Sequence, residues 1–146
     1  MLTLSKKVEY ALIAILHMAR QPESDLATAK AMADHYHIPG ELMGKVLQSL
    51  ARAKLITSTQ GSRGGYQLQR PVESITLGQV IEAVEGPVVL TRCQEDPATC
   101  GQFHGCTIKE PIQHVHEQLV RFIHGISLGA FRAPEPAEPM HLDKAI

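Results

Sequence analysis

Features that define whole classes of protein are missing from this chain of 146 residues. It contains no run of about 18 apolar residues, which a membrane-spanning helix needs, so we expect no membrane partner. Its first residues lead directly into an amphipathic pattern and lack the apolar core and cleavage site of a signal peptide, which indicates a cytoplasmic protein. No serine-histidine-aspartate arrangement, phosphate loop or His-Glu-x-x-His motif is present, so we do not expect an enzyme.

Acidic residues are absent from one part of the chain. The net charge of −1 does not by itself indicate a nucleic-acid partner. Between residues 45 and 70, however, there is no aspartate or glutamate, and the basic residues there are Lys45, Arg52, Lys54, Arg63 and Arg70. The distribution of charge, rather than its sum, therefore offers a basic face.

The periodicity of the sequence predicts a mainly α fold with a small β-wing. Apolar residues recur at helical spacing over about 6–19, 29–37 and 41–54, and Ser5 and Thr28 are suitable N-caps. Two short strands are expected at 55–60 and 66–69, around a glycine-rich turn, and Thr76-Leu-Gly-Gln79 is a capping box that starts a further helix. Together these elements predict a winged helix-turn-helix domain over residues 1–87.

Cysteine is scarce but concentrated. Cys93, Cys100 and Cys106 fall within one stretch of 14 residues, with six and then five residues between them. Thiolates are soft ligands that favour zinc, copper(I) or iron-sulfur clusters, and a loop rich in glycine and proline can curl around one ion or cluster. We therefore predict a ligand loop over residues 88–110. Three unrelated buried cysteines are the simpler alternative, and a disulfide would leave one thiol over.

A last apolar pattern lies beyond this loop. After Pro111 the apolar residues alternate spacings of three and four, as in Ile112, Val115, Leu119, Phe122 and Ile126. So narrow a stripe is typical of a helix that pairs with another helix, and little chain remains to cover it from within the same domain. We predict a long C-terminal dimerisation helix over 111–131, a homodimer, and a disordered tail over 132–146.

Four segments and the three cysteines together resemble the Rrf-type winged-helix regulators. The segments are LSKKVEYAL at 4–12, LQSLARAKLI at 47–56, GSRGGY at 61–66 and ITLGQVIEAVEGP at 75–87. This bacterial family includes the iron-sulfur assembly regulator IscR, the nitric-oxide sensor NsrR and the iron regulator RirA. The resemblance implies a homodimer that binds a pseudo-palindromic operator in duplex DNA. It also implies a 2Fe-2S or 4Fe-4S cluster, of which we expect 2Fe-2S, held by the three cysteines and a variable fourth ligand.

The chain departs from the family pattern at two positions. Lys54 stands where a glycine is common after the recognition helix, so a left-handed helix end would cost more there or be remodelled. Lys109 stands where IscR-like members have the histidine that serves as the fourth ligand. A lysine ammonium has no lone pair, so the fourth ligand has to be another group.

The resemblance to NsrR-like members implies Glu9 of the partner subunit as this fourth ligand. The alternative for Glu9 is an ordinary surface glutamate paired with Lys6. His104 is the competing ligand because it lies inside the cysteine loop, and His114 and His116 are further candidates from the next helix.

The contacts with the operator follow from family position. Lys45 is expected to donate to guanine, and Glu41 to accept from cytosine or to cap the helix. Gln48 and Arg52 are expected to touch phosphate, and Arg63 at the tip of the wing to enter the minor groove or hold phosphate. The full set is Glu41, Gly44, Lys45, Gln48, Arg52 and Arg63.

These observations predict an iron-sulfur-dependent transcriptional repressor that senses nitric oxide, redox state or iron-sulfur status. Loss of a carboxylate ligand between the subunits would release the first helix and change the spacing of the two recognition helices. Two alternatives stay open, namely the same fold sensing by thiol oxidation without a cluster, and a structural zinc-binding module. A ferredoxin-like electron carrier is a third, against which the wing and its basic neighbours argue.

Overall fold

A computed structural model describes residues 3–132 and places a helix-turn-helix near the start of the chain. Its helices are, in chain order, α1 (Lys6–Arg20), α2 (Ala29–Tyr36) and α3 (Gly40–Arg52). The first two begin at the predicted N-caps, because the side chains of Ser5 and Thr28 accept hydrogen bonds from backbone N–H groups one turn further on. The break before α3 falls at Pro39, as predicted.

An antiparallel β-hairpin follows α3 and forms the predicted wing. Strand β1 (Ile56–Thr59) pairs with β2 (Gly65–Leu68). The backbone of Ala27, just before α2, exchanges hydrogen bonds of 2.8 and 2.9 Å with Tyr66. Gly64 is required in the turn, since a Cβ there would lie 2.2 Å from a backbone carbonyl oxygen of β1. The wing is therefore tied to the helix-turn-helix as well as to itself.

The core lies where α1, α3 and a further helix, α4 (Leu77–Glu85), pack against one another. This helix starts with the predicted capping box: the Thr76 side chain accepts from the Gln79 N–H at 3.3 Å, and the Gln79 side chain accepts from the Thr76 N–H at 3.0 Å. Each large side chain buried in the core stabilises the fold by about 2 kcal/mol, because apolar surface leaves water. Those with almost no exposed surface include Ile15, Met43, Leu47, Leu50 and Val80.

The end of α3 contains a left-handed residue that is not glycine. Lys54 has a φ of 58°. Its N–H donates to the carbonyl of Ala51 at 3.0 Å, and the N–H of Leu55 donates to the carbonyl of Leu50 at 3.1 Å. These are the two hydrogen bonds of a Schellman motif. The left-handed helix end is kept rather than remodelled, with a lysine in the position that favours glycine.

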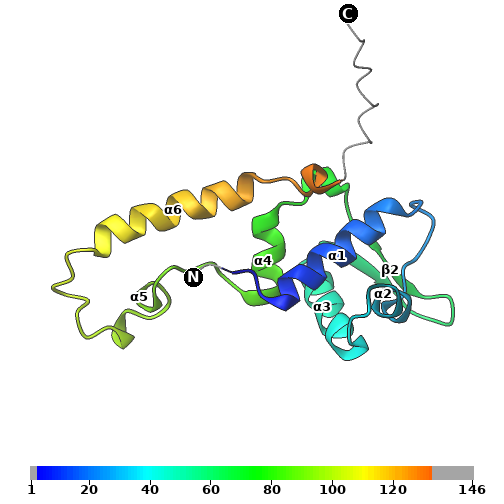
Figure 1. Ribbon diagram of the computed structural model, residues 1–146, viewed down its shortest axis with the longest axis horizontal. Helices are drawn as coiled ribbons and strands as arrows, with labels where there is room; N and C mark the ends of the chain where they lie inside the picture. The colour runs from blue at the N-terminus through cyan, green and yellow to red at the C-terminus, as the bar shows by residue number, and fades with distance from the viewer. Residues whose placement is uncertain (1–2, 133–146) are drawn as a thin grey trace, which may run out of the picture.

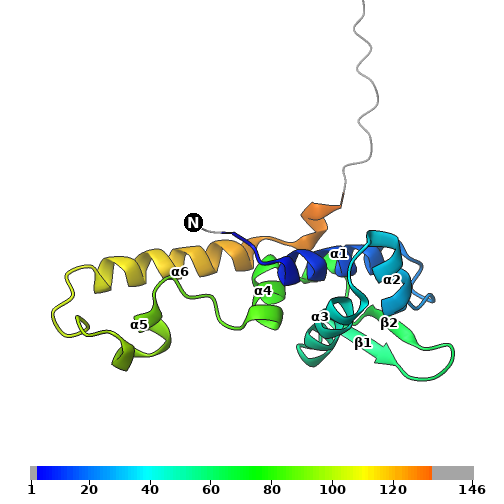
Figure 2. The same cartoon turned by 60° about the horizontal axis from the view of Figure 1, so that its bottom comes forward.

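Beyond α4 the chain leaves the helix-turn-helix and returns along an arm. The short helix α5 (Arg92–Glu95) and a 3₁₀ turn (Pro97–Thr99) carry part of the cysteine segment. Helix α6 (Lys109–Gly125) then forms an arm that projects from the body of the molecule (Figure 1). Figure 2 shows from a second side that the cysteine segment lies at the outer end of this arm, away from the wing.

The arm helix differs from the predicted helix of residues 111–131 at both ends. It begins before residue 111 and stops well before residue 131, and Ile126 has an extended backbone. Pairing with the segment before α4 replaces further helical hydrogen bonds: the Leu77 N–H donates to the Ile126 carbonyl at 2.9 Å, and the Leu128 N–H donates to the Ile75 carbonyl at 2.8 Å. Ile126 therefore does not belong to the helical stripe, and Leu128 is fully buried in the core.

A 3₁₀ turn (Leu128–Phe131) ends the part of the chain that the structure describes, together with Arg132. The predicted disordered tail, residues 132–146, lies outside the described residues from 133 onward. Among the described helices, none is both long enough and apolar enough to cross a lipid bilayer.

Candidate metal centre and nucleic-acid interface

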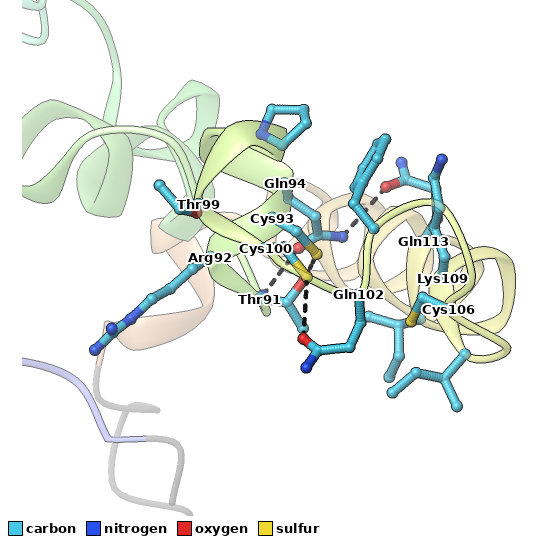
Figure 3. Close-up of a pocket in the computed structure, with 14 residues that line it drawn as sticks. Thr91, Arg92, Cys93, Gln94, Thr99, Cys100, Gln102, Cys106, Lys109 and Gln113 are labelled. Carbon is cyan, nitrogen blue, oxygen red and sulfur yellow. Dashed lines mark hydrogen bonds between the residues drawn. The ribbon is translucent and has the colours of Figure 1, made fainter.

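The three cysteines line one cavity of about 660 Å³ at the outer end of the arm (Figure 3). Cys93 lies on α5, Cys100 follows the 3₁₀ turn, and Cys106 lies shortly before α6. All three are free thiols of intermediate exposure. The shared cavity is compatible with the prediction that this loop curls the three cysteines around one ion or cluster, and that prediction stays untested.

Hydrogen bonds and a cation-π contact hold the walls of the cavity. The amide of Gln94 accepts from the Thr91 N–H at 3.1 Å and donates to Gln113 on α6 at 3.2 Å, so that α5 is tied to the arm. On the other side, the ammonium of Lys109 lies 3.7 Å from the centre of the Phe103 ring, in a cation-π contact. The lysine that replaces the IscR-type histidine therefore braces the loop.

The possible metal donors of the cavity are three cysteine thiols, the type of ligand that zinc and iron-sulfur clusters prefer. No carboxylate or imidazole lines this cavity; of its two basic lining residues, Arg92 extends away from the sulfur atoms and Lys109 lies over Phe103 (Figure 3). Within residues 3–132, no three histidine, cysteine or acidic side chains are gathered closely enough to hold a single metal ion. In this protomer the three thiols therefore share a cavity without forming a ready-made metal site, and no fourth protein ligand from the described residues lines the cavity.

The two leading candidates for the fourth ligand both lie outside the cavity in the protomer. His104 is exposed and contacts the edge of the Phe103 ring, with ring centres 5.7 Å apart. Glu9, 41% exposed at its side chain, forms an ion pair of 2.6 Å with Lys6. In the protomer Glu9 is thus a surface glutamate paired with Lys6, which was the alternative considered for it. Its role as a ligand from the partner subunit stays a prediction.

The helix α3 presents one exposed polar face. Glu41, Lys45, Gln48 and Arg52 follow spacings of four, three and four, which place them along one side of a helix, and all four are exposed. Lys45 donates to Glu41 at 2.6 Å, and this hydrogen bond, with the attraction of the ammonium charge, lowers the pKa of Glu41. Arg63 is exposed in the turn of the wing. The structure brings these predicted contact residues to the surface, free of the core.

Gly44 lies on the same helix between these side chains. No heavy atom lies within 4 Å of the position that a Cβ would take there, so packing within the protomer does not require a glycine. A glycine inside a helix costs about 1 kcal/mol relative to alanine. Close approach of another molecule to the helix at this point would explain why a glycine stands there despite this cost.

Residues 4–133 match the sequence profile of a family described as "Rrf2: Iron-dependent Transcriptional regulator". The chain belongs to the Rrf2 family. Members of this family are transcription regulators that bind DNA, so the exposed face of α3 and the wing belong to a DNA-binding protein and not to an enzyme.

Individual relatives agree with this assignment. The HTH-type transcriptional regulator NsrR of Oceanobacillus iheyensis is 30% identical over 122 residues, which cover 83% of this chain and 81% of that protein. The HTH-type regulator slr0846 of Synechocystis is 40% identical over 82 residues, which are 56% of this chain and only 56% of that relative. The structure of CymR, the global cysteine regulator of B. subtilis, matches with a TM-score of 0.67 at 23% identity, covering 90% of this chain and 96% of that chain. At this identity the likeness supports the shared fold and nothing more.

The joint between the arm and the DNA-binding domain of this Rrf2 family member is not among the features predicted from the sequence. Residues 75–78 read ITLG and residues 126–129 read ISLG. The two tetrapeptides meet in an antiparallel bridge between Thr76 and Ser127. Next to this bridge, His124 packs on Gly78.

Proposed function

We propose that this Rrf2 family member is an iron-sulfur-dependent transcriptional repressor, which acts as a homodimer on a pseudo-palindromic operator. One observation carries the proposal: three thiols line a single cavity that contains no carboxylate or imidazole. Soft thiolate sets of this kind favour iron-sulfur clusters or zinc. The description of the family as iron-dependent favours iron over zinc.

Cys93, Cys100 and Cys106 would hold the cluster, which we expect to be 2Fe-2S, and Glu9 of the partner subunit would complete its ligands. A bound cluster supplies sensitivity to oxidant, nitric oxide or iron supply. In the protomer Glu9 is paired with Lys6 near the start of α1, close to the surface, so its carboxylate is accessible to a second subunit. A carboxylate is a harder ligand than a thiolate and is the more exchangeable of the four.

An apolar stripe on the arm supports the dimer. Ile108, Val115 and Phe122 recur every seven residues and are 59%, 50% and 67% exposed. Ile112 and Leu119 lie between them and are half-buried. Large apolar side chains in a heptad pattern are typical of a helix that packs on another helix. A second copy of α6, related by two-fold symmetry, would cover this stripe.

The operator contacts follow from the exposed face of α3. Lys45 and Glu41 would read bases in the major groove, where Gly44 permits a close approach, while Gln48 and Arg52 would contact phosphate. Because Lys45 is hydrogen-bonded to Glu41 in the free protein, this pair has to be rearranged when Lys45 donates to guanine. Arg63 would reach the minor groove or a phosphate from the wing.

The test is anaerobic purification with an absorption spectrum, followed by operator binding with the cluster present and after its removal. We expect visible absorption, a large difference in operator affinity between the two forms, and loss of both after Cys100→Ala. Glu9→Ala should weaken cluster retention, while Asp34→Ala, which removes a comparable surface ion pair with Lys30 at 2.7 Å, should not.

Other outcomes would overturn parts of this proposal. A colourless protein that contains zinc and binds DNA with constant affinity would make the cavity a structural zinc site. A protein without metal whose affinity changes on thiol oxidation would establish sensing by cysteine chemistry alone. Equal spectra and responses for wild type and Glu9→Ala would remove Glu9 from the ligand set.

A further inference from the structure

Near the inner end of the arm, one side chain of α6 fits closely against the DNA-binding domain. The imidazole of His124, in the last turn of α6, packs directly on Gly78 in the first turn of α4. A Cβ on Gly78 would lie 2.6 Å from Cδ2 of His124, closer than side-chain carbons approach one another. The Nε2 of His124 also lies 3.1 Å from Oε1 of Glu82, one turn further along α4, and donates to it.

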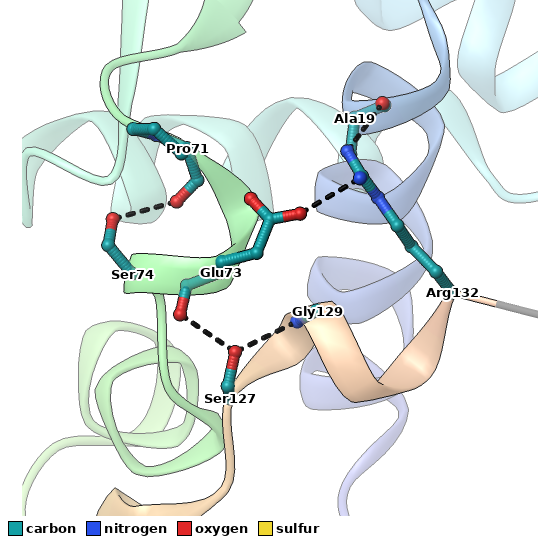
Figure 4. Close-up of polar contacts among 7 residues, drawn as sticks. All are labelled: Ala19, Pro71, Glu73, Ser74, Ser127, Gly129 and Arg132. Atoms are coloured by element: carbon teal, nitrogen blue, oxygen red, sulfur yellow. Dashed lines mark hydrogen bonds and ion pairs between the residues drawn. The ribbon is translucent and has the colours of Figure 1, made fainter.

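The chain that follows α6 is fastened separately. Ser127 Oγ donates to the backbone carbonyl of Glu73 at 2.7 Å, and Arg132 pairs with the Glu73 carboxylate at 2.8 Å and reaches the Ala19 carbonyl at 3.4 Å (Figure 4). These contacts hold residues beyond the helix in place. The angle at which α6 leaves the domain depends in addition on contacts of the helix itself, His124 among them.

Helix α4 is well placed to transmit a change at this joint. It packs against α1 and against the DNA-reading helix α3, as well as against α6. At 1.5 Å per residue the 17-residue arm is about 25 Å long, so a tilt of about 10° at its inner end moves the cysteine end by about 4 Å. A small misfit between His124 and Gly78 is therefore amplified at the cysteine cavity and along the apolar stripe.

We propose that His124 is a positioning residue that sets the angle between the arm and α4, and so couples the state of the cysteine cavity to the recognition helix. The inference rests on the proposed sensing function, because the coupled signal is the one received at the cysteines. Gly78 supplies the space for the imidazole, and Glu82 fixes the direction of the ring. A rigid joint transmits a displacement of the arm to α4, whereas a loose joint absorbs it.

Three variants test the joint. Gly78→Ala expels the ring, His124→Ala removes it, and the double variant Gly78→Ala/His124→Ala lets the new methyl group occupy part of the vacated space. Gly125→Ala is the matched control, because it adds a methyl group next to His124 at a position where no other part of the protomer comes within 4 Å, its chain neighbours and own helix backbone aside. The measured quantity is the ratio of operator affinities between the cluster-loaded and cluster-free forms of the full chain.

We expect Gly78→Ala and His124→Ala to reduce this ratio at least tenfold, equivalent to about 1.4 kcal/mol of coupling, while the visible spectrum per bound iron is unchanged. The double variant should recover part of the ratio lost by Gly78→Ala, and Gly125→Ala should match wild type. If Gly78→Ala does not fold, His124→Ala carries the test, since it introduces no clash.

Hydrogen-deuterium exchange on the cluster-free protein gives a second readout. The last turn of α6 should exchange faster in both single variants, with α1 to α3 unchanged. Wild-type ratios in both single variants, or an equal loss in Gly125→Ala, would overturn the role of His124. A wild-type protein with no difference between its loaded and cluster-free forms would instead refute the sensing function, while the exchange experiment would still report on the joint.

Discussion

Replacing Lys54 by glycine should stabilise this protein. A residue with a Cβ in the left-handed region costs about 1–2 kcal/mol, and Lys54 has a φ of 58° with both Schellman hydrogen bonds in place. Glycine removes this cost but adds conformational entropy to the unfolded chain, which takes back about 0.4–1 kcal/mol. The net gain in the free energy of unfolding for Lys54→Gly should be about 1 kcal/mol.

Thermal and urea unfolding of the reduced, cluster-free protein would measure this gain. For a chain of 146 residues, about 1 kcal/mol raises Tm by about 2–4 °C. Protein concentration must be equal across the series, since dimer formation adds to the apparent stability. Lys54→Ala is the matched control, because it removes the same charge and side chain but keeps the Cβ. If Lys54→Gly proves no more stable than Lys54→Ala, the left-handed strain assigned to this helix end is absent.

Three further predictions concern dimer formation, pH and DNA reading. Phe122→Asp should weaken the dimer about 30- to 1000-fold in analytical ultracentrifugation, because burying this residue, which is 67% exposed in the protomer, is worth about 1–2 kcal/mol in each subunit and counts twice in a symmetric dimer. Burial, with repulsion from His35, lowers the pKa of His17 below 6.5, so the fold favours its neutral form. Stability should therefore be full above about pH 6.5 and fall as pH decreases through the lowered pKa of His17, and His17→Gln should flatten this decrease in Tm. Lys45→Ala should relax the sequence preference of operator binding in competition assays, whereas Arg52→Ala should weaken binding to all sequences and reduce its salt dependence.

Each of these has a result that contradicts it. His114→Asp adds the same charge to a face of α6 away from the apolar stripe, and a loss of dimer equal to that of Phe122→Asp would show that the stripe is not the interface. A Tm that decreases with acid equally in wild type and His17→Gln would place the titrating group elsewhere. Identical, salt-like effects of Lys45→Ala and Arg52→Ala would remove the base-reading role of Lys45.

Local sequence determined the elements of the fold. The N-caps Ser5 and Thr28 and the Thr76–Gln79 capping box involve residues within one turn of each other, so the helix starts were predicted correctly. The wing was equally readable, because the glycine-rich turn and the strands on either side are adjacent in the chain. Lys54, at the position where the family commonly has glycine, also indicated in advance that a left-handed end of α3 would be energetically unfavourable.

Only the tertiary structure decided where the arm ends and what it contacts. The stripe pattern carried the predicted helix through Ile126, but pairing of this segment with the residues before α4 competes with helical hydrogen bonds and stops α6 earlier. The partners lie far apart in the sequence, so no local preference could reveal that Leu128 enters the core or that His124 rests on Gly78. The grouping of the three cysteines is visible in the sequence. Their common cavity, which lacks a fourth ligand, forms only on folding, because α5 and the start of α6 must first be brought together.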